Sequence, residues 1–237
     1  IDTQCAISQM DVAPRDLYAP LVGDENRIEF FNNDGKDLFS FFCKLEKANE
    51  NGKKVRVLHF GDSQILRDRG TKKLRSLLNQ HYKGSGPGLQ TVGRFLGGYE
   101  HRSLSCQHSS NWKFYDSFLF PVKSVPHNKY GMMSIFSRYG DISDTVLKKR
   151  NAWVEYEPSK FANDNVKNWQ DIRMYYESPK GDFTIRLYHK EMLIDTFVLS
   201  QTTSATVFKY HFKEPVNHLR IEFSSEFTPD FYGIAFY

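Results

Sequence analysis

A short turn that contains a serine is the part of this sequence whose residue types could do covalent chemistry. Residues 60–63 read Phe-Gly-Asp-Ser, and they follow a mostly apolar run and precede a helical pattern. A serine in that place lies at the positive end of a helix dipole, where backbone N–H groups bind anions. A tetrahedral acyl intermediate is such an anion, so Ser63 could be a nucleophile whose own N–H donates to the oxyanion. Alternatively, Asp62 or Ser63 caps the helix, as both residue types often do.

The elements expected to position this turn are a strand and two helices. Residues 55–60 are short and mostly apolar, which is typical of a strand buried on both faces of a parallel sheet. A helical pattern over residues 66–82 follows the turn, and an earlier one ends at Asn51-Gly52. The earlier helix has apolar residues at the spacing i, i+3, i+4 and i+7: Leu38, Phe41, Phe42 and Leu45. Residues 1–94 are therefore expected to form the N-terminal part of an α/β domain.

The rest of the chain has a different composition and a different period. Residues 95–237 hold 28 of the 36 aromatic residues and all three tryptophans. Apolar and polar residues alternate there with period two, which predicts antiparallel strands with one face in water. The apolar positions of the three clearest runs are Phe183, Ile185 and Leu187, then Phe208, Tyr210 and Phe212, then Leu219, Ile221 and Phe223. The fold class is therefore α+β, with an antiparallel β-sandwich of jelly-roll type over residues 95–237.

The sequence around the serine resembles a known enzyme family. Val57 to Gln64, the helix after it and the glycine-rich stretch 84–88 resemble the first block of the SGNH hydrolases, the GDSL-type serine esterases and lipases. The bacterial extracytoplasmic branch of that family carries an inserted sandwich similar to a carbohydrate-binding module. This resemblance implies that Ser63 is the nucleophile and an oxyanion donor, that Asp62 supports the turn, and that Gly61 permits it. It also implies an O-acyl, in particular acetyl, ester of a carbohydrate or of peptidoglycan as substrate, without cofactor or metal.

The family's general base is missing from the chain. The resemblance requires an Asp-x-x-His near the carboxyl terminus, and without a base a serine is a poor nucleophile at neutral pH. None of the eight histidines has an aspartate three residues before it: His59, His81, His101, His108, His127, His189, His211 and His218. We therefore interpret the chain as the N-terminal portion of a larger esterase, inactive alone, whose partner is the missing C-terminal half or another copy of the chain. The alternative is a non-catalytic carbohydrate-binding sandwich module.

Other ligand classes have weaker support in the sequence. The net charge of +4 does not require a nucleic acid, and no apolar run is long enough to span a membrane. Three cysteines without a CxxC pair predict neither a zinc site nor a disulfide scaffold. A calcium ion between Asp141 and Asp144 stays open, as does sugar stacking by tryptophan, although tryptophan in a sandwich is more often core. We expect an extracytoplasmic protein, periplasmic or secreted, whose signal peptide has been removed.

Overall fold

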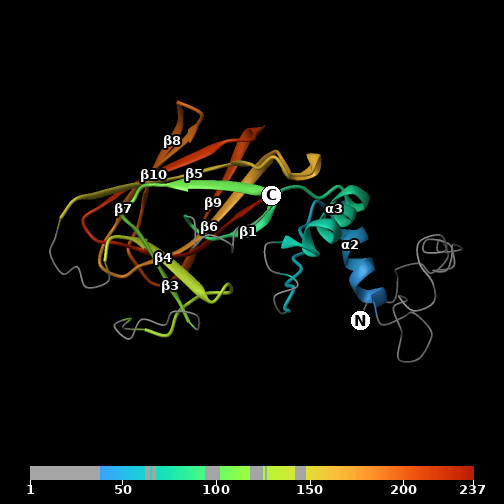
Figure 1. Ribbon diagram of the computed structural model, residues 1–237, viewed down its shortest axis with the longest axis horizontal. Coiled ribbons are helices and arrows are strands. Elements are labelled where there is room, and N and C mark those ends of the chain that lie inside the picture. The colour runs from blue at the N-terminus through green and yellow to red at the C-terminus, as the bar shows by residue number, and fades with distance from the viewer. Residues whose placement is uncertain are drawn as a thin grey trace, which may run out of the picture. The chain divides into compact units, whose positions relative to one another are not determined.

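The chain divides into two compact units, residues 1–58 and residues 59–237 (Figure 1). A computed structural model describes residues 38–61, 65, 68–93, 102–117, 125, 127–141 and 148–237. In the first unit, helix α2 (Phe39–Asn51) confirms the first helical pattern. Gly52 ends it in the left-handed conformation with φ 63°, and its N–H donates to the carbonyl of Ala48.

The strand expected at residues 55–60 is not formed. Residues 53–61 have no strand assignment, and the side chains of Val57, Leu58 and Phe60 are 50%, 56% and 79% exposed. The prediction of a strand buried on both faces is therefore wrong. A parallel strand needs hydrogen-bonded neighbours at its edges and layers on both faces, and no described strand pairs with this segment. The apolar composition of residues 55–60 is therefore not sufficient to form a buried strand.

Helix α3 (Thr71–Tyr82) confirms the second helical pattern but begins five residues later than expected. A turn over residues 68–70 precedes it, and the buried carboxylate of Asp68 accepts hydrogen bonds from Thr71 and from the guanidinium of Arg75. Asn165, which lies in the short 3-10 helix η5 (Asp164–Val166), donates a 3.1 Å hydrogen bond to the carbonyl of Ser76. No helix in the described part of the chain is long and apolar enough to cross a bilayer.

Residues 88–236 form two antiparallel sheets (Figure 1). The first sheet has the order β3-β4-β11-β6-β9, with β1 also paired to β11; the second has the order β2-β5-β10-β7-β8. The strands of the first sheet are β1 (Gly88–Gln90), β3 (Trp112–Asp116), β4 (Ile135–Tyr139), β6 (Trp169–Ser178), β9 (Thr202–Val216) and β11 (Asp230–Phe236). Those of the second sheet are β2 (Leu104–His108), β5 (Arg150–Pro158), β7 (Phe183–His189), β8 (Met192–Leu199) and β10 (Leu219–Ser225). From β5 onward the chain passes repeatedly between the sheets, which confirms the predicted sandwich of jelly-roll type.

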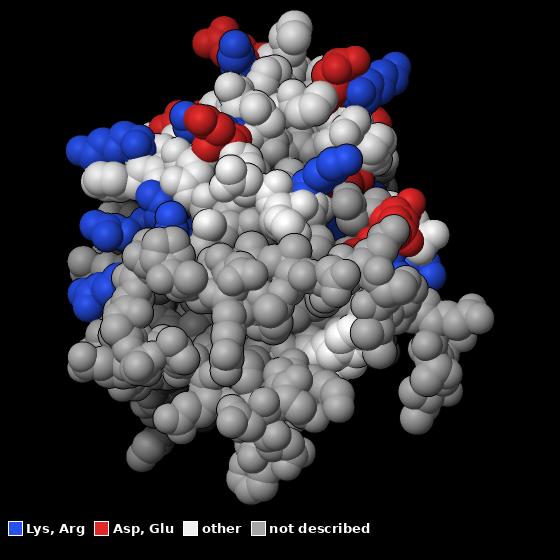
Figure 2. Space-filling view, turned by 90° about the vertical axis from the view of Figure 1, so that its right-hand side faces the viewer, with Lys and Arg blue, Asp and Glu red and all other residues white. Residues whose placement is uncertain are grey.

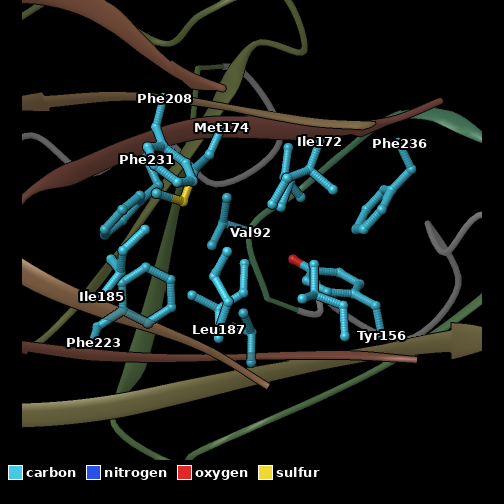
Figure 3. Close-up of a cluster of buried hydrophobic side chains, with 14 of the residues drawn as sticks. Val92, Tyr156, Ile172, Met174, Ile185, Leu187, Phe208, Phe223, Phe231 and Phe236 are labelled. Atoms are coloured by element: carbon cyan, nitrogen blue, oxygen red, sulfur yellow. The ribbon is translucent and has the colours of Figure 1, made fainter. Parts of the chain in front are cut away.

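The core lies between the two sheets and follows the predicted period of two. Figure 3 shows Met174, Phe208 and Phe231 of the first sheet pointing toward Ile185 and Phe223 of the second. The predicted apolar positions of β7 and β10 are all at most 2% exposed, and their polar neighbours point outward. Period two therefore identified the inward face correctly, because successive side chains of a strand point to opposite faces.

The glycine-rich stretch 84–88 packs closely against β11 and leads into strand β1 of the sandwich. Strand β1 pairs with β11, and Val92 is 1% exposed in the core. Gly86 has φ 76°, and a Cβ added there would lie 2.4 Å from the carbonyl oxygen of Phe236. The sandwich thus includes residues that the expected boundary at 94/95 assigned to the preceding part of the chain.

Candidate functional site

The outer face of the five-stranded sheet carries a grid of polar and aromatic side chains. The strand register places Trp153 opposite Glu222, and Glu222 opposite Arg186. A parallel row lies on each side of this one. The first consists of Glu155, Arg220 and Tyr188, and the second consists of Asn151, Ser224 and Thr184. Because residues i and i+2 of a strand share a face, all nine positions lie on one surface.

Ion pairs and a cation–π contact order the centre of this grid. The guanidinium of Arg220 lies over the indole of Trp153, with 4.4 Å between Cζ and the ring centroid. The same guanidinium donates to Glu222 at 3.1 and 3.2 Å and to Glu155 at 3.4 Å. Glu155 also lies 2.6 Å from Nε2 of His218. These contacts hold the indole ring in one orientation on the sheet surface.

An open cavity of about 450 Å³ lies beside the indole. The side chains of Trp153, Glu222 and Arg186 line it, together with Lys149, Asn151 and Ser224. In the strand register, Ser224 lies two residues from Glu222 in the direction opposite to Arg220. The cavity is therefore on one side of the Trp153–Glu222 pair and Arg220 is on the other. The site thus combines one half-buried aromatic ring with several convergent polar groups, and polar groups of this kind fix the orientation of a ligand.

The three tryptophans separate into two groups. Trp112 and Trp169 are 4% and 0% exposed and belong to the core, as expected for most tryptophans in a sandwich. Their indole N–H groups donate to the carbonyls of Trp153 and Val166 at 3.1 and 2.9 Å. Trp153 is half-buried on the outer face and is the tryptophan that lines the cavity. The open alternative of sugar stacking thus concerns this residue.

No described contact places the predicted catalytic turn, residues 60–63, on the outer face of the five-stranded sheet. Asp62 and Ser63 lie outside the described residues. Gly61 is exposed and irregular, and a Cβ there would lie 3.2 Å from the side chain of Ile65. The strand that was expected to hold this turn is missing, so the placement of Ser63 stays a prediction.

A second polar cluster lies on the six-stranded sheet, but its charges pair with one another. The buried carboxylate of Asp230 accepts from Arg138 Nε at 2.7 Å and lies 3.1 Å from Nε2 of His127. Glu177 accepts from Lys129 at 2.6 Å and from the hydroxyl of Tyr232 at 3.0 Å. This cluster fastens residues 127–129 to the sheet, which is a structural role.

Three cationic side chains, those of Lys72, Arg75 and Arg150, have hydrogen-bond or ion-pair partners in the described part of the chain. Lys72 donates to the carbonyl of Phe161, Arg75 pairs with Asp68, and Arg150 donates to the carbonyls of residues 148 and 226. Figure 2 shows blue and red side chains beside one another toward the top of the view and a group of blue side chains along its left edge.

Metal binding has no support among the described residues. They contain no group of three or more His, Cys, Asp or Glu side chains that could hold a metal ion. Asp144, one of the two carboxylates considered for calcium, lies outside the described residues. Cys43 and Cys106 are both half-buried.

Sequence reasoning did not combine the residues of the outer face. Arg186, Arg220 and Glu222 are the polar positions of the predicted strands, but nothing in the sequence states which strands are neighbours. Lys149 lies in the basic run Lys148-Lys149-Arg150, and short basic clusters are usually solvated surfaces. The available signal was the alternation itself, because the outward positions of β5 and β10 hold a tryptophan and three charged residues, Glu155, Arg220 and Glu222.

Comparisons with known proteins give distant structural neighbours. No protein-family model matches the sequence, and no curated protein matches it. TmCBM61 in complex with β-1,4-galactotriose is 8% identical, with 56% of this chain and 87% of that chain covered and a TM-score of 0.37. A Family 29 carbohydrate-binding module is 9% identical, with 62% and 90% covered and a TM-score of 0.33. A fucose-binding module of Streptococcus pneumoniae is 9% identical, with 65% and 92% covered and a TM-score of 0.31.

Proposed function

We propose that the sandwich is a non-catalytic carbohydrate-binding module and that its site is the outer face of the five-stranded sheet. The observation that carries this proposal is the half-buried indole of Trp153 at the edge of an open polar cavity of about 450 Å³. The C–H-rich face of a sugar ring packs against an aromatic ring, while its hydroxyl groups need hydrogen-bond donors and acceptors around the rim.

The cavity offers both kinds of contact. Glu222 supplies acceptors, Arg186 and Lys149 supply donors, and Asn151 and Ser224 supply both. Arg220 fixes the indole before a ligand arrives, which reduces the entropy that binding would cost. An open, shallow cavity on a rigid sheet suits a chain of sugars that passes over the surface.

A glycan array with the full chain tests this proposal. We expect binding of one or more polysaccharides by the wild-type protein and a loss of at least about tenfold in affinity for Trp153→Ala, which corresponds to about 1.4 kcal/mol. Phe161→Ala is the matched control, because Phe161 is another exposed aromatic residue, at 47%, outside the cavity. Binding that Trp153→Ala leaves unchanged would move the site elsewhere. No binding of any glycan by the folded wild-type protein would contradict the module itself.

The serine-esterase hypothesis remains a second candidate, for a larger assembly that includes this chain. One observation favours it: Leu74 and Leu77, on one side of α3, are 46% and 50% exposed. In an α/β domain that side of the helix faces a sheet. The proposed roles are Ser63 as nucleophile and oxyanion donor, with Asp62 and Gly61 shaping the turn. A partner would have to supply the general base and the rest of the parallel sheet. An acyl-serine intermediate is compatible both with hydrolysis and with transfer of the acyl group.

A further inference from the structure

We infer that the cavity beside Trp153 selects acidic saccharides, those that carry a carboxylate such as a uronic acid, over neutral ones. This inference rests on the proposed function and specifies its ligand class. The carrying observation is the charge that remains in the cavity once the ion pairs of the face are formed. The lining contains two cationic side chains, Lys149 and Arg186, and one carboxylate, Glu222.

The ion-pair partner of Glu222 lies outside the cavity: it is Arg220, which also pairs with Glu155. Arg220 donates to Oε1 of Glu222 through both Nε and Nη2, at 3.2 and 3.1 Å. Arg220 lies in the neighbouring row of the grid and does not line the cavity. The carboxylate of Glu222 is therefore paired with Arg220, which lies outside the cavity lining.

Among the residues that the structure describes, the two cations of the lining keep their donors available. Neither Lys149 nor Arg186 makes an ion pair or a hydrogen bond with any residue that the structure describes, and both are exposed. Arg186 lies opposite Glu222 on one side and Thr196 on the other, so no second carboxylate is its cross-strand neighbour. An arginine fork can accept a carboxylate through two parallel hydrogen bonds, and a lysine adds a compact charge.

The arrangement gives the two parts of the site different tasks. The Trp153 indole packs against the sugar ring, and the two cations bind the acid group that the ring carries. Dissolved salt screens the attraction between the ligand's carboxylate and the two exposed cations, whereas it does not screen the contacts of a neutral sugar. The binding of an acidic glycan should therefore weaken as the salt concentration rises.

The test compares each acidic polysaccharide with its own carboxyl-reduced form, in which uronic acids become neutral sugars. The probes are alginate, polygalacturonate, hyaluronan and heparosan, each native and reduced, with binding measured by affinity electrophoresis and calorimetry of the full chain. We expect at least one native polymer to bind at least about tenfold more tightly than its reduced form. Arg186→Gln should remove most of that difference, and Lys149→Gln should reduce it. Lys209→Gln, an exposed lysine of β9 on the other sheet, is the charge-matched control and should change nothing.

The outcomes separate this inference from the function on which it rests. Binding that is equal for native and reduced polymers, or that Arg186→Gln leaves intact, would overturn the acid preference. If Trp153→Ala still abolished that binding, the module would stand and only its ligand class would be wrong. Absence of binding to all eight polymers and to every neutral glycan of the array would contradict both. Circular dichroism of each variant shows whether the sandwich is folded.

Discussion

Arg220 covers one side of the indole of Trp153, at 4.4 Å from Cζ to the ring centroid, while the cavity lies on the other side of the Trp153–Glu222 pair. The two residues come from neighbouring strands, β5 and β10, and their side chains share the outer face of the sheet. A core aromatic residue packs on all sides, whereas this one is supported from one side and presented to solvent. Its contribution to stability and to binding should therefore differ from that of the buried tryptophans.

Truncation of a core tryptophan should destabilise the chain far more than truncation of the cavity tryptophan. Trp169 is 0% exposed and donates to the carbonyl of Val166, so we expect Trp169→Ala to lower the free energy of unfolding by about 3–5 kcal/mol. Trp153→Ala should cost about 1 kcal/mol, since it removes a ring on the outer face that is only partly buried and one cation–π contact. Urea denaturation followed by circular dichroism measures both values. Similar losses for the two variants would show that Trp153 is a core residue.

Gly86 should tolerate alanine much less than Gly88 does. Both have positive φ, 76° and 81°, so both substitutions carry the strain of a left-handed L-residue, about 1–2 kcal/mol. At Gly86 the new Cβ also meets the backbone oxygen of Phe236 at 2.4 Å, whereas at Gly88 nothing lies within 4 Å. We expect Gly86→Ala to lower the unfolding free energy by at least about 1 kcal/mol more than Gly88→Ala. Equal losses in thermal unfolding would contradict the close approach of β11.

Stability should fall in alkaline solution. Burial raises the pKa of Tyr139 and of Tyr156, and burial together with the carboxylates of Asp230 and Glu177 raises the pKa of Tyr232. An unfolded tyrosine ionises near pH 10, so the stabilisation is complete below that pH and is lost as the pH rises above it. Each such tyrosine should contribute a slope of about 1.4 kcal/mol per pH unit above pH 10.

Urea unfolding at pH 8 to 11, with tyrosinate absorbance recorded in parallel, measures this slope. Tyr139→Phe is the informative variant, because Tyr139 forms one side-chain hydrogen bond, at 2.7 Å to Ser225, and phenylalanine cannot ionise. This variant should be less stable at pH 8 but should show a shallower alkaline fall, by about one proton. An unchanged slope would mean that Tyr139 ionises in the folded chain.

Ser63 should not confer esterase activity on this chain alone. A serine without a general base is a weak nucleophile, and none of the eight histidines has the family's spacing from an aspartate. Hydrolysis of p-nitrophenyl acetate by the wild-type chain should equal that by Ser63→Ala. Robust turnover that depends on Ser63 would contradict the argument that the base must come from a partner.

The sequence by itself determined the β-sandwich, its inward face and both helices. Period two in β7 and β10 identified residues such as Ile185 and Ile221, because a strand turns alternate side chains to opposite faces whatever its neighbours are. Asn51-Gly52 marked the end of α2, because glycine accepts the left-handed conformation at low cost.

Only the tertiary structure decided which strands are neighbours, and with that the candidate site. Trp153, Glu222 and Arg186 lie side by side because β10 pairs with β5 and with β7, and strand order depends on packing of the whole core. The same dependence explains the error at residues 55–60, whose apolar character predicted a buried strand although the described chain offers it no hydrogen-bonded neighbour. Local patterns determine how a segment folds if it has partners, and long-range pairing determines which partners it has.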